Sequence, residues 1–251
     1  MKVSWRDVRG PVVAAHRGLS AEHPENTSRS FQAAVEAGFD SLELDLRVTH
    51  DGEVVALHDP SLNRTTDGAG RVADMAYDEL RAYDAGGGPV PRFDDLLSRH
   101  GGRALLWNME TKVLGAVAPA IRLLEHHRLV PKVLHMSFQP GQLARSQDLL
   151  PELARGLLLA HPPKADDFQR ARRLGCDWVV GEHGTWDHAR IRRAHDAGLR
   201  AGAYTVNDPA RALQLVEWGL ECVITDRRDV LAAVRSQTRS PVGAEVEVRP
   251  A

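Results

Sequence analysis

Three acidic residues of the sequence fall where a metal site could form. Glu43 and Asp45 lie two positions apart within the apolar run SLELDLRVT, and residues two apart on a strand point to the same face of a sheet. Glu110 ends a later apolar run, RALLWNME. Carboxylates gathered in a poorly solvated place raise their own pKa values unless a cation is bound, and oxygen ligands suit Mg²⁺, Ca²⁺ or Mn²⁺. The pattern leaves open the alternative of an ion pair from Glu43 or Glu110 to Lys112 or Arg17.

Two histidines and two cationic side chains stand at the ends of the same apolar runs. His16 and Arg17 follow PVVAAH directly, His58 ends EVVALH, and Lys112 lies two residues beyond Glu110. Two imidazoles at one site indicate an acid and a base that act near neutral pH. An arginine is a fork-shaped donor suited to phosphate. Together with a metal, these residues predict cleavage of a phosphate ester.

These residues need a scaffold that gathers strand ends, and the sequence predicts one. Apolar runs typical of strands alternate with helical patterns. The predicted strands cover 11–16, 41–49, 53–58, 103–110, 132–138, 155–160, 178–183, 200–206 and 221–226. The predicted helices cover 27–37, 75–83, 93–100, 116–128, 140–148, 166–174, 187–197, 209–217 and 229–235. Such alternation is typical of a parallel α/β architecture.

Nine predicted strands are one too many for an eightfold barrel, and a hairpin accounts for the extra one. Asp51-Gly52 is a two-residue turn signal, which predicts that Asp45 lies opposite His58 across an antiparallel pair. Eight parallel strands remain. The sequence therefore predicts an α/β fold, a (β/α)8 TIM barrel with a β-hairpin excursion after the second strand. An open doubly wound sheet is the alternative, but no Gly-rich phosphate loop supports it.

Composition narrows the class of ligand and the cellular setting. The chain has 251 residues and a formal charge of −2, which predicts no nucleic-acid partner and favours a small-molecule phosphodiester. No apolar run approaches the roughly 20 residues of a membrane span, and the first residues lack the apolar stretch of a signal peptide. We therefore expect a cytoplasmic protein with no membrane span.

The cysteines and the chain ends complete the predicted organisation. Cys176 and Cys222 lie in apolar surroundings and are expected to be buried thiols. Residues 1–235 are predicted to form a single phosphodiesterase barrel domain. Residues 236–251 are polar and contain proline, which predicts a flexible C-terminal tail.

At this point the ordered motifs resemble those of a known family, the glycerophosphodiester phosphodiesterases. The resemblance runs from about Pro11 to Leu231, and the set of motifs together is specific. The matching motifs are His16-Arg17-Gly18, Pro24-Glu25-Asn26-Thr27, Gly38-Phe39-Asp40, Glu43-Leu44-Asp45, Thr49-His50-Asp51-Gly52, His58-Asp59, Arg64-Thr65-Thr66, Gly70, Glu110-Thr111-Lys112, Ser137-Phe138, Thr205-Val206-Asn207 and Thr225-Asp226.

The resemblance implies metal-dependent hydrolysis of glycerophosphodiesters to sn-glycerol 3-phosphate and an alcohol. It assigns roles to ten residues, namely the metal ligands Glu43, Asp45 and Glu110 of one divalent cation, the acid/base pair His16 and His58, and the substrate-binding residues Arg17, Lys112, Glu25, Asn26 and Tyr204. Tyr204 stands where the family usually has tryptophan. For Glu25 the residues alone leave a second interpretation open, a place beside the cap of a helix.

Other functions remain as alternatives. Lysophospholipase D or sphingomyelinase-D-like activity on lipid phosphodiesters would use the same centre, but needs an apolar mouth. Aromatic residues make up only 5% of the chain, and the excursion after His58 is short. A barrel that binds without catalysis would lack one of the histidines or carboxylates. A purely structural role would leave five ionisable groups together with no ligand, at a high desolvation cost.

Overall fold

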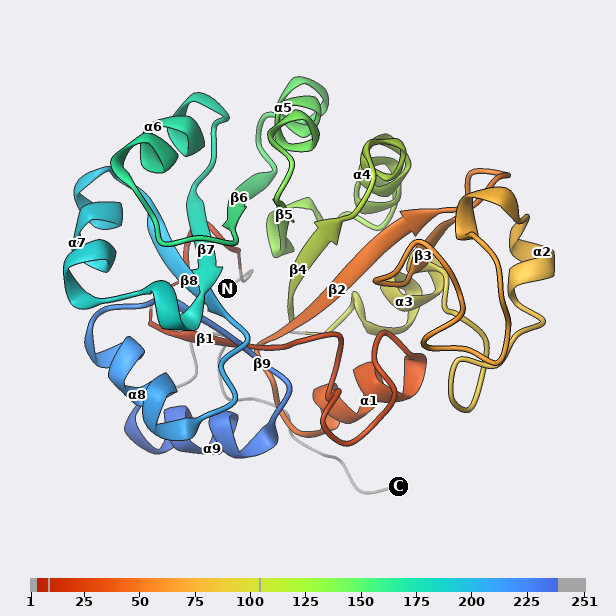
Figure 1. Ribbon diagram of the computed structural model, residues 1–251, viewed down its shortest axis with the longest axis horizontal. Helices are drawn as coiled ribbons and strands as arrows, with labels where there is room; N and C mark the ends of the chain where they lie inside the picture. Colours follow the sequence, from red (N-terminus) through yellow and green to blue (C-terminus); the bar gives the residue numbers. More distant parts are fainter. Residues whose placement is uncertain (1–3, 9, 104, 239–251) are drawn as a thin grey trace.

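Eight parallel strands close into a barrel, as the sequence predicts (Figure 1). The computed structural model describes residues 4–8, 10–103 and 105–238. The barrel strands are β1 (Val12–Ala15), β2 (Ser41–Val48), β4 (Leu106–Thr111), β5 (Val133–Ser137), β6 (Ala154–Leu159), β7 (Trp178–Glu182), β8 (Arg200–Tyr204) and β9 (Cys222–Thr225). Strand β1 pairs with both β2 and β9, and these two pairings close the barrel. The carboxyl ends of all eight strands therefore meet at one end of the barrel.

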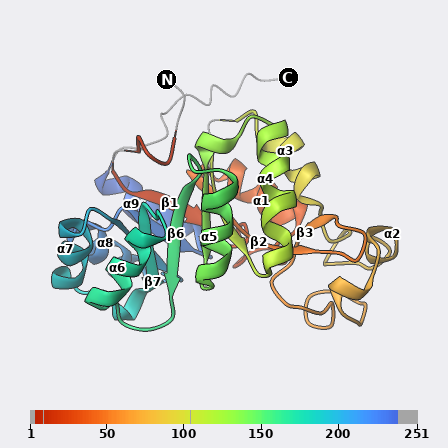
Figure 2. The same cartoon turned by 90° about the horizontal axis from the view of Figure 1, so that it is seen from above.

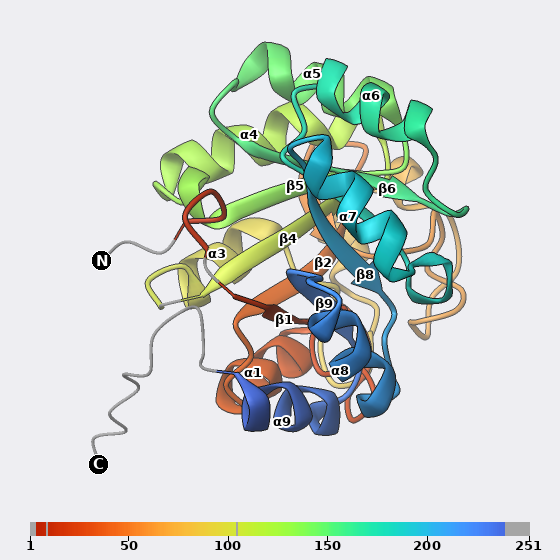
Figure 3. The same cartoon turned by 90° about the vertical axis from the view of Figure 1, so that its left-hand side faces the viewer.

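Helices surround the strands on the outside, except α2, which lies apart in the segment between β3 and α3 (Figures 1 and 3). They are α1 (Ser28–Glu36), α2 (Tyr77–Leu80), α3 (Phe93–His100), α4 (Val117–His126), α5 (Pro140–Leu149), α6 (Ala165–Arg173), α7 (His188–Asp196), α8 (Pro209–Glu217) and α9 (Arg228–Gln237). Short 3-10 turns cover Val72–Asp74, Leu114–Ala116, Val130–Lys132 and His183–Thr185. The side chain of Thr27 accepts a hydrogen bond from the Ser30 N–H and caps α1, in agreement with the predicted helix start.

Several predicted boundaries differ from the structure, and two of them bear on the organisation of the chain. The helix predicted over 75–83 is reduced to the single turn of α2, because the segment around it folds into irregular turns. Helix α9 continues through Gln237, so the first residues of the segment 236–251, predicted as a tail, are helical. Buried Val234 and Leu231 hold this last turn against the barrel. The remainder of that segment, from 239 onward, lies outside the described residues.

The hairpin is present, but its predicted register is wrong by one residue. Strand β3 (Val54–Ala56) pairs antiparallel with β2, and Leu46 lies opposite Ala56. The Thr49 N–H donates to the Glu53 carbonyl at 3.0 Å, so the loop has three residues and Gly52 takes a positive φ of 91°. The backbone carbonyl of Asp45 consequently accepts a hydrogen bond from the Leu57 N–H at 2.9 Å, and Asp45 does not lie opposite His58. His58 follows the strand, beyond the ladder.

The barrel interior is apolar at its amino end. Trp5 enters there, donates its indole N–H to the Trp107 carbonyl at 3.0 Å and packs edge-on against Trp178 at 5.1 Å between ring centroids. Arg200 at the start of β8 donates to the Trp5 carbonyl at 2.9 Å. Residues 4–8 thus seal the amino end of the barrel. Ser41 and Asn108 are buried further in and hydrogen-bonded to each other, and Glu43, Asp45 and Glu110 follow toward the other end.

The segment between β3 and α3 forms an excursion beside the barrel, at the right of Figure 1 and again in Figure 2. It has its own small apolar core, which includes Val55, Leu57, Leu62 and Leu80. This core fixes the turn 58–66 against the barrel rim. Across the described residues, no helix is both long enough and apolar enough to cross a membrane.

Candidate active site

A pocket of about 250 Å³ opens at the carboxyl ends of the barrel strands, where barrel enzymes carry their active sites. One wall is polar and the other mainly apolar. The polar wall consists of His16, Arg17, Glu43, His58, Glu110 and Lys112, and the facing wall of Met136, Phe138, Leu158, Tyr204, Thr205 and Ile224. Residues predicted from the sequence as catalytic, phosphate-binding and metal-binding therefore meet in one place.

Glu43, Asp45 and Glu110 are buried and converge. One carboxylate oxygen from each lies within 4.8 Å of the others. Of the ion pairs that the sequence left open, the one between Lys112 and Glu110 forms, and both cationic side chains also pair with Asp45. Lys112 Nζ lies 2.9 Å from Asp45 and 2.6 Å from Glu110, and Arg17 Nε lies 3.0 Å from Asp45. The cluster thus has three carboxylates and two cationic side chains at the floor of the pocket, where little of their surface reaches solvent.

The electrostatics of the three carboxylates are uneven. Burial, together with the Asp45 charge, raises the pKa of Glu43 to about 7 and that of Glu110 also to about 7. Burial opposes ionisation of Asp45 too, but Lys112 and Arg17 outweigh it and hold the pKa of Asp45 below its usual range. Glu43 and Glu110 therefore have too little positive charge around them to stay ionised below about pH 7, whereas Asp45 has enough.

That shortage fits a divalent cation. Three carboxylate oxygens in a buried cluster match the hard, all-oxygen ligands of Mg²⁺, Ca²⁺ or Mn²⁺. Asp45 is also positioned for such a role, since Asn26 donates from Nδ2 to its Oδ2 at 2.9 Å and accepts from its N–H at 3.3 Å. The residues present thus fit one divalent ion held by Glu43, Asp45 and Glu110.

His16 stands directly after β1 and is oriented by the last strand. Its Nδ1 lies 2.7 Å from Asp226 Oδ1, which also accepts from Ser20 Oγ at 2.7 Å, while Asn207 donates to Asp226 Oδ2 at 2.6 Å. Burial disfavours the imidazolium, but the hydrogen bond to Asp226 and the Glu43 charge outweigh it and raise the pKa of His16. The Nε2 atom faces the carboxylates, 4.0 Å from Glu43.

His58 has a similar partner but a different charge balance. Its Nδ1 lies 2.7 Å from Asp59 Oδ1. Since an ionised carboxylate only accepts hydrogen bonds, Nδ1 carries the hydrogen and Nε2 keeps its lone pair. Burial lowers the pKa of His58 in spite of Asp59. The two imidazoles of the pocket are therefore shifted in opposite directions.

Arg17 and Asn26 sit in a tight loop between β1 and α1. Both have a φ of 55°, an uncommon value for a residue with a side chain, and the Asn26 N–H donates to the Arg17 carbonyl at 2.9 Å. The Arg17 N–H donates to Glu43 at 2.9 Å. The loop therefore turns Arg17 back over the carboxylates, while Asn26 lies buried beneath Asp45 and outside the pocket lining.

Glu25 does not belong to the first turn of α1, which begins at Ser28. Its carboxylate instead binds Arg17 Nη1 at 2.9 Å and the guanidinium of Arg64 at 2.7 Å. Glu25 thus lies outside the pocket lining and contacts Arg17 through an ion pair.

The facing wall carries an aromatic pair. Tyr204 donates its hydroxyl to the Leu159 carbonyl at 2.7 Å, so its ring is fixed, and Phe138 packs edge-on against it at 5.9 Å between centroids. Phe138 is 41% exposed at the rim. Burial raises the pKa of the Tyr204 hydroxyl above 10, so this residue acts as a neutral apolar surface.

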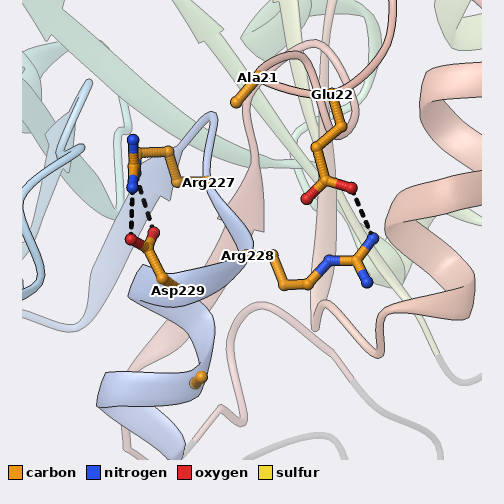
Figure 4. Close-up of a pocket in the computed structure, with 6 residues that line it drawn as sticks. Ala21, Glu22, Arg227, Arg228 and Asp229 are labelled. Carbon is orange, nitrogen blue, oxygen red and sulfur yellow. Dashed lines mark hydrogen bonds and ion pairs between the residues drawn. The ribbon is translucent and has the colours of Figure 1, made fainter.

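A second, larger pocket of about 510 Å³ lies nearby at the start of α9 (Figure 4). Its charged residues are already paired, because Arg227 binds Asp229 and Arg228 Nη2 lies 2.8 Å from Glu22. It does not include the carboxylate cluster or His58. The smaller pocket is therefore the better candidate site.

Sequence reasoning missed several residues of the site. Asp226, Asp59 and Arg64 were visible only as parts of motifs, without a role, and the apolar wall was not anticipated. The signal available for Asp226 was its place after the apolar run ECVIT, at the end of β9. Arg64 carries no such signal, because it lies in an irregular turn.

Comparison with known proteins agrees with this fold and pocket. The sequence model of the glycerophosphoryl diester phosphodiesterase family matches residues 16–230. A glycerophosphodiester phosphodiesterase of Bacillus subtilis is 30% identical, over 89% of this chain and 86% of that protein. One from Caldanaerobacter subterraneus is 34% identical, over 88% of this chain and 96% of that protein.

A solved structure is similar as well. The phosphodiesterase of Oleispira antarctica, in complex with the product sn-glycerol-3-phosphate, superposes with a TM-score of 0.84 at 29% identity, over 90% of this chain and 97% of that one. These findings define the class of protein, a barrel hydrolase of phosphodiesters. The chain belongs to the glycerophosphoryl diester phosphodiesterase family.

Proposed function

We propose that the protein hydrolyses glycerophosphodiesters to sn-glycerol 3-phosphate and an alcohol, with one divalent cation and two histidines. The observation that carries the proposal is the convergence of three buried carboxylates within 4.8 Å, in a pocket lined by two histidines that each have a carboxylate partner. The relative from Oleispira antarctica holds the product sn-glycerol-3-phosphate, which supports the same product here.

In this proposal Glu43, Asp45 and Glu110 hold the cation. When bound, such an ion neutralises phosphate charge and makes a nearby oxygen more acidic. Arg17 and Lys112 line the pocket and bind the non-bridging oxygens of the phosphate, whose charge suits a guanidinium fork and an ammonium group. Both cations are partly buried and held by acidic partners, so they are already oriented before substrate enters.

His58 and His16 divide the proton transfers. His58, with its pKa lowered and Nε2 unprotonated, accepts the proton of the attacking oxygen. His16, with its pKa raised, donates a proton to the oxygen of the departing alcohol as the bond to phosphorus breaks. The histidines then exchange their protons with water, which restores the starting state.

The remaining predicted residues act around this centre. Glu25 and Asn26 serve the substrate indirectly, through Arg17 and Asp45. Tyr204 and the apolar wall contact the hydrocarbon groups of the substrate. The single-domain organisation over 1–235 and the cytoplasmic location stay predictions.

A lipid phosphodiester is the second candidate substrate, and one feature favours it. Phe138 (41% exposed) and Leu114 (57% exposed) are large apolar side chains that follow β5 and β4 at the pocket end of the barrel. Such residues can contact an acyl chain. Under this candidate, lysophospholipase D activity would use the same centre.

A substrate panel tests the proposal. Glycerophosphocholine, glycerophosphoethanolamine, glycerophosphoinositol and bis(glycero)phosphate are incubated with the protein beside lysophosphatidylcholine, and the phosphorus-containing products are identified. We expect sn-glycerol 3-phosphate from the glycerol esters. Release of lysophosphatidate alone would move the assignment to the lipid reaction, and no product from any of the five would contradict both.

A further inference from the structure

Arg64 occupies a junction between two carboxylates beside the pocket. Its Nη1 and Nη2 lie 2.9 and 2.7 Å from the two oxygens of Glu25, and its Nε and Nη2 lie 2.6 and 3.1 Å from the two oxygens of Asp59. Both contacts are fork-to-fork pairs, the geometry that fixes direction as well as distance. Four hydrogen bonds therefore hold one side chain to two carboxylates.

Each of these carboxylates leads directly to a residue of the pocket. Asp59 Oδ1 lies 2.7 Å from His58 Nδ1, and Glu25 Oε1 lies 2.9 Å from Arg17 Nη1. Arg64 is thus two contacts away from both the imidazole and the guanidinium of the proposed centre. His58, the first residue of the turn 58–66, lines the pocket, but Arg64 itself does not.

The junction also joins two segments that are far apart in the sequence, and these segments meet again where Gly86 lies against Pro24. Arg64 and Asp59 belong to the excursion after β3, while Glu25 lies in the loop between β1 and α1. That loop has the two strained residues Arg17 and Asn26, both at a φ of 55°. A strained backbone conformation persists only where contacts with the surrounding structure stabilise it. The hydrogen bonds of Arg64 to Glu25 supply such a contact from outside the loop.

We propose that Arg64 is a positioning residue, which sets the orientation of His58 through Asp59 and of Arg17 through Glu25. A role in stability alone fits less well, because Arg64 is a surface residue with 47% of its side chain exposed and exposed ion pairs contribute little to folding. Orientation matters far more, since a misplacement of about 1 Å costs on the order of 100-fold in rate. The inference rests on the proposed function.

The kinetic test compares Arg64→Ala and Arg64→Lys with a matched control. Arg92 makes a similar fork to Asp95, at 3.0 Å, and lies 3.9 Å from Glu53, but within the described residues neither carboxylate makes a hydrogen bond or ion pair to a residue of the pocket lining, as Glu25 and Asp59 do. We expect Arg64→Ala to lower kcat by about 10- to 100-fold with a smaller change in KM. Arg64→Lys keeps the charge without the fork and should recover part of the loss. Arg92→Ala should keep kcat within about twofold.

A spectroscopic test needs no substrate. The imidazole ¹⁵N signals of His58, assigned by their loss in His58→Asn, should report one Nδ1–H tautomer in the unmodified protein and an average of tautomers in Arg64→Ala. Unchanged His58 signals in Arg64→Ala would overturn the proposal, as would a kcat within about twofold of the unmodified protein or an equal loss in Arg92→Ala. If the unmodified protein cleaves no glycerophosphodiester, the proposed function fails, and the ¹⁵N signals still decide the role of Arg64.

Discussion

Binding of a divalent cation to Glu43, Asp45 and Glu110 should release protons, and the number released should fall as pH rises. Without a cation, burial and mutual repulsion raise the pKa of both Glu43 and Glu110 to about 7, so each carries a proton below that pH. A cation binds the ionised forms and displaces those protons. Asp45 has a lowered pKa, is already ionised and contributes none.

The expected numbers follow from these pKa values. With both groups titrating near 7, binding releases roughly two protons at pH 6 and close to none above pH 8. The apparent affinity should consequently rise up to about 100-fold per pH unit below pH 6, and level off above pH 8. This is a steep dependence for a site whose ligands are all carboxylates, which in water would ionise by pH 6.

Isothermal titration calorimetry of Mg²⁺, Ca²⁺ or Mn²⁺ in two buffers of different ionisation enthalpy measures the protons released. Glu110→Gln removes one of the two protonated groups, and should release about one proton at pH 6 with weaker binding. Glu182→Gln is the matched control, because Glu182 ends β7, a barrel strand that pairs with neither β2 nor β4, and lies outside the cluster. It should behave like the unmodified protein. Proton release that does not change between pH 6 and 8, or Glu110→Gln with unaltered affinity, would refute the reasoning.

Three further changes test separate parts of the account. His58→Asn should retain the cation and lose turnover on the order of 10²- to 10⁴-fold, and near-normal turnover would remove His58 from the mechanism. Asp226→Asn should lower the pKa of His16, because the Asp226 hydrogen bond raises it, so kcat/KM should decline at a lower pH on the alkaline side. An alkaline limb at its original pH would argue against His16 as the proton donor. Trp5→Ala should destabilise the protein by about 3–5 kcal/mol in urea unfolding, since Trp5 fills the amino end of the barrel, and a loss under about 1 kcal/mol would contradict that role.

The barrel was predictable because its strands are buried on both faces. Such strands appear in the sequence as continuous apolar runs, whereas apolar residues in the helices between them recur every three to four positions. The shared direction of Glu43 and Asp45 was also predictable, because side-chain alternation in a strand is a local property. The structure then shows that the carboxylate cluster coexists with the Lys112–Glu110 ion pair, which the sequence treated as an alternative to a metal site, and that Lys112 and Arg17 also pair with Asp45.

The hairpin register could not be fixed in the same way. Asp51-Gly52 fits a two-residue loop as well as the last part of a three-residue loop. Gly52 has a positive φ in both, and the choice depends on the φ of Asp51, which a two-residue type I′ turn needs positive and which is not positive here. A shift of one residue changes every cross-strand partner, so the predicted pairing of Asp45 with His58 was wrong. His58 still lines the pocket, because it lies beyond the last paired residue of β3, where the strand register no longer determines the direction of its side chain.

Contacts across long sequence separations were out of reach. His16 and Asp226 lie 210 positions apart, and Glu25 and Arg64 lie 39 apart. Only the closure of the barrel brings β9 beside β1, and only the path of the excursion brings Arg64 to the loop after β1. The sequence therefore predicted the residues that line the pocket's polar wall, but not the residues that orient them.

The central claim is a cation-dependent phosphodiesterase centre, and the release of sn-glycerol 3-phosphate from glycerophosphodiesters tests it most directly. The rate is measured before EDTA, after EDTA, and after Mg²⁺, Ca²⁺ or Mn²⁺ is restored in excess. The account predicts release that EDTA abolishes and at least one of the three ions restores. Release that continues at an undiminished rate in EDTA would contradict it.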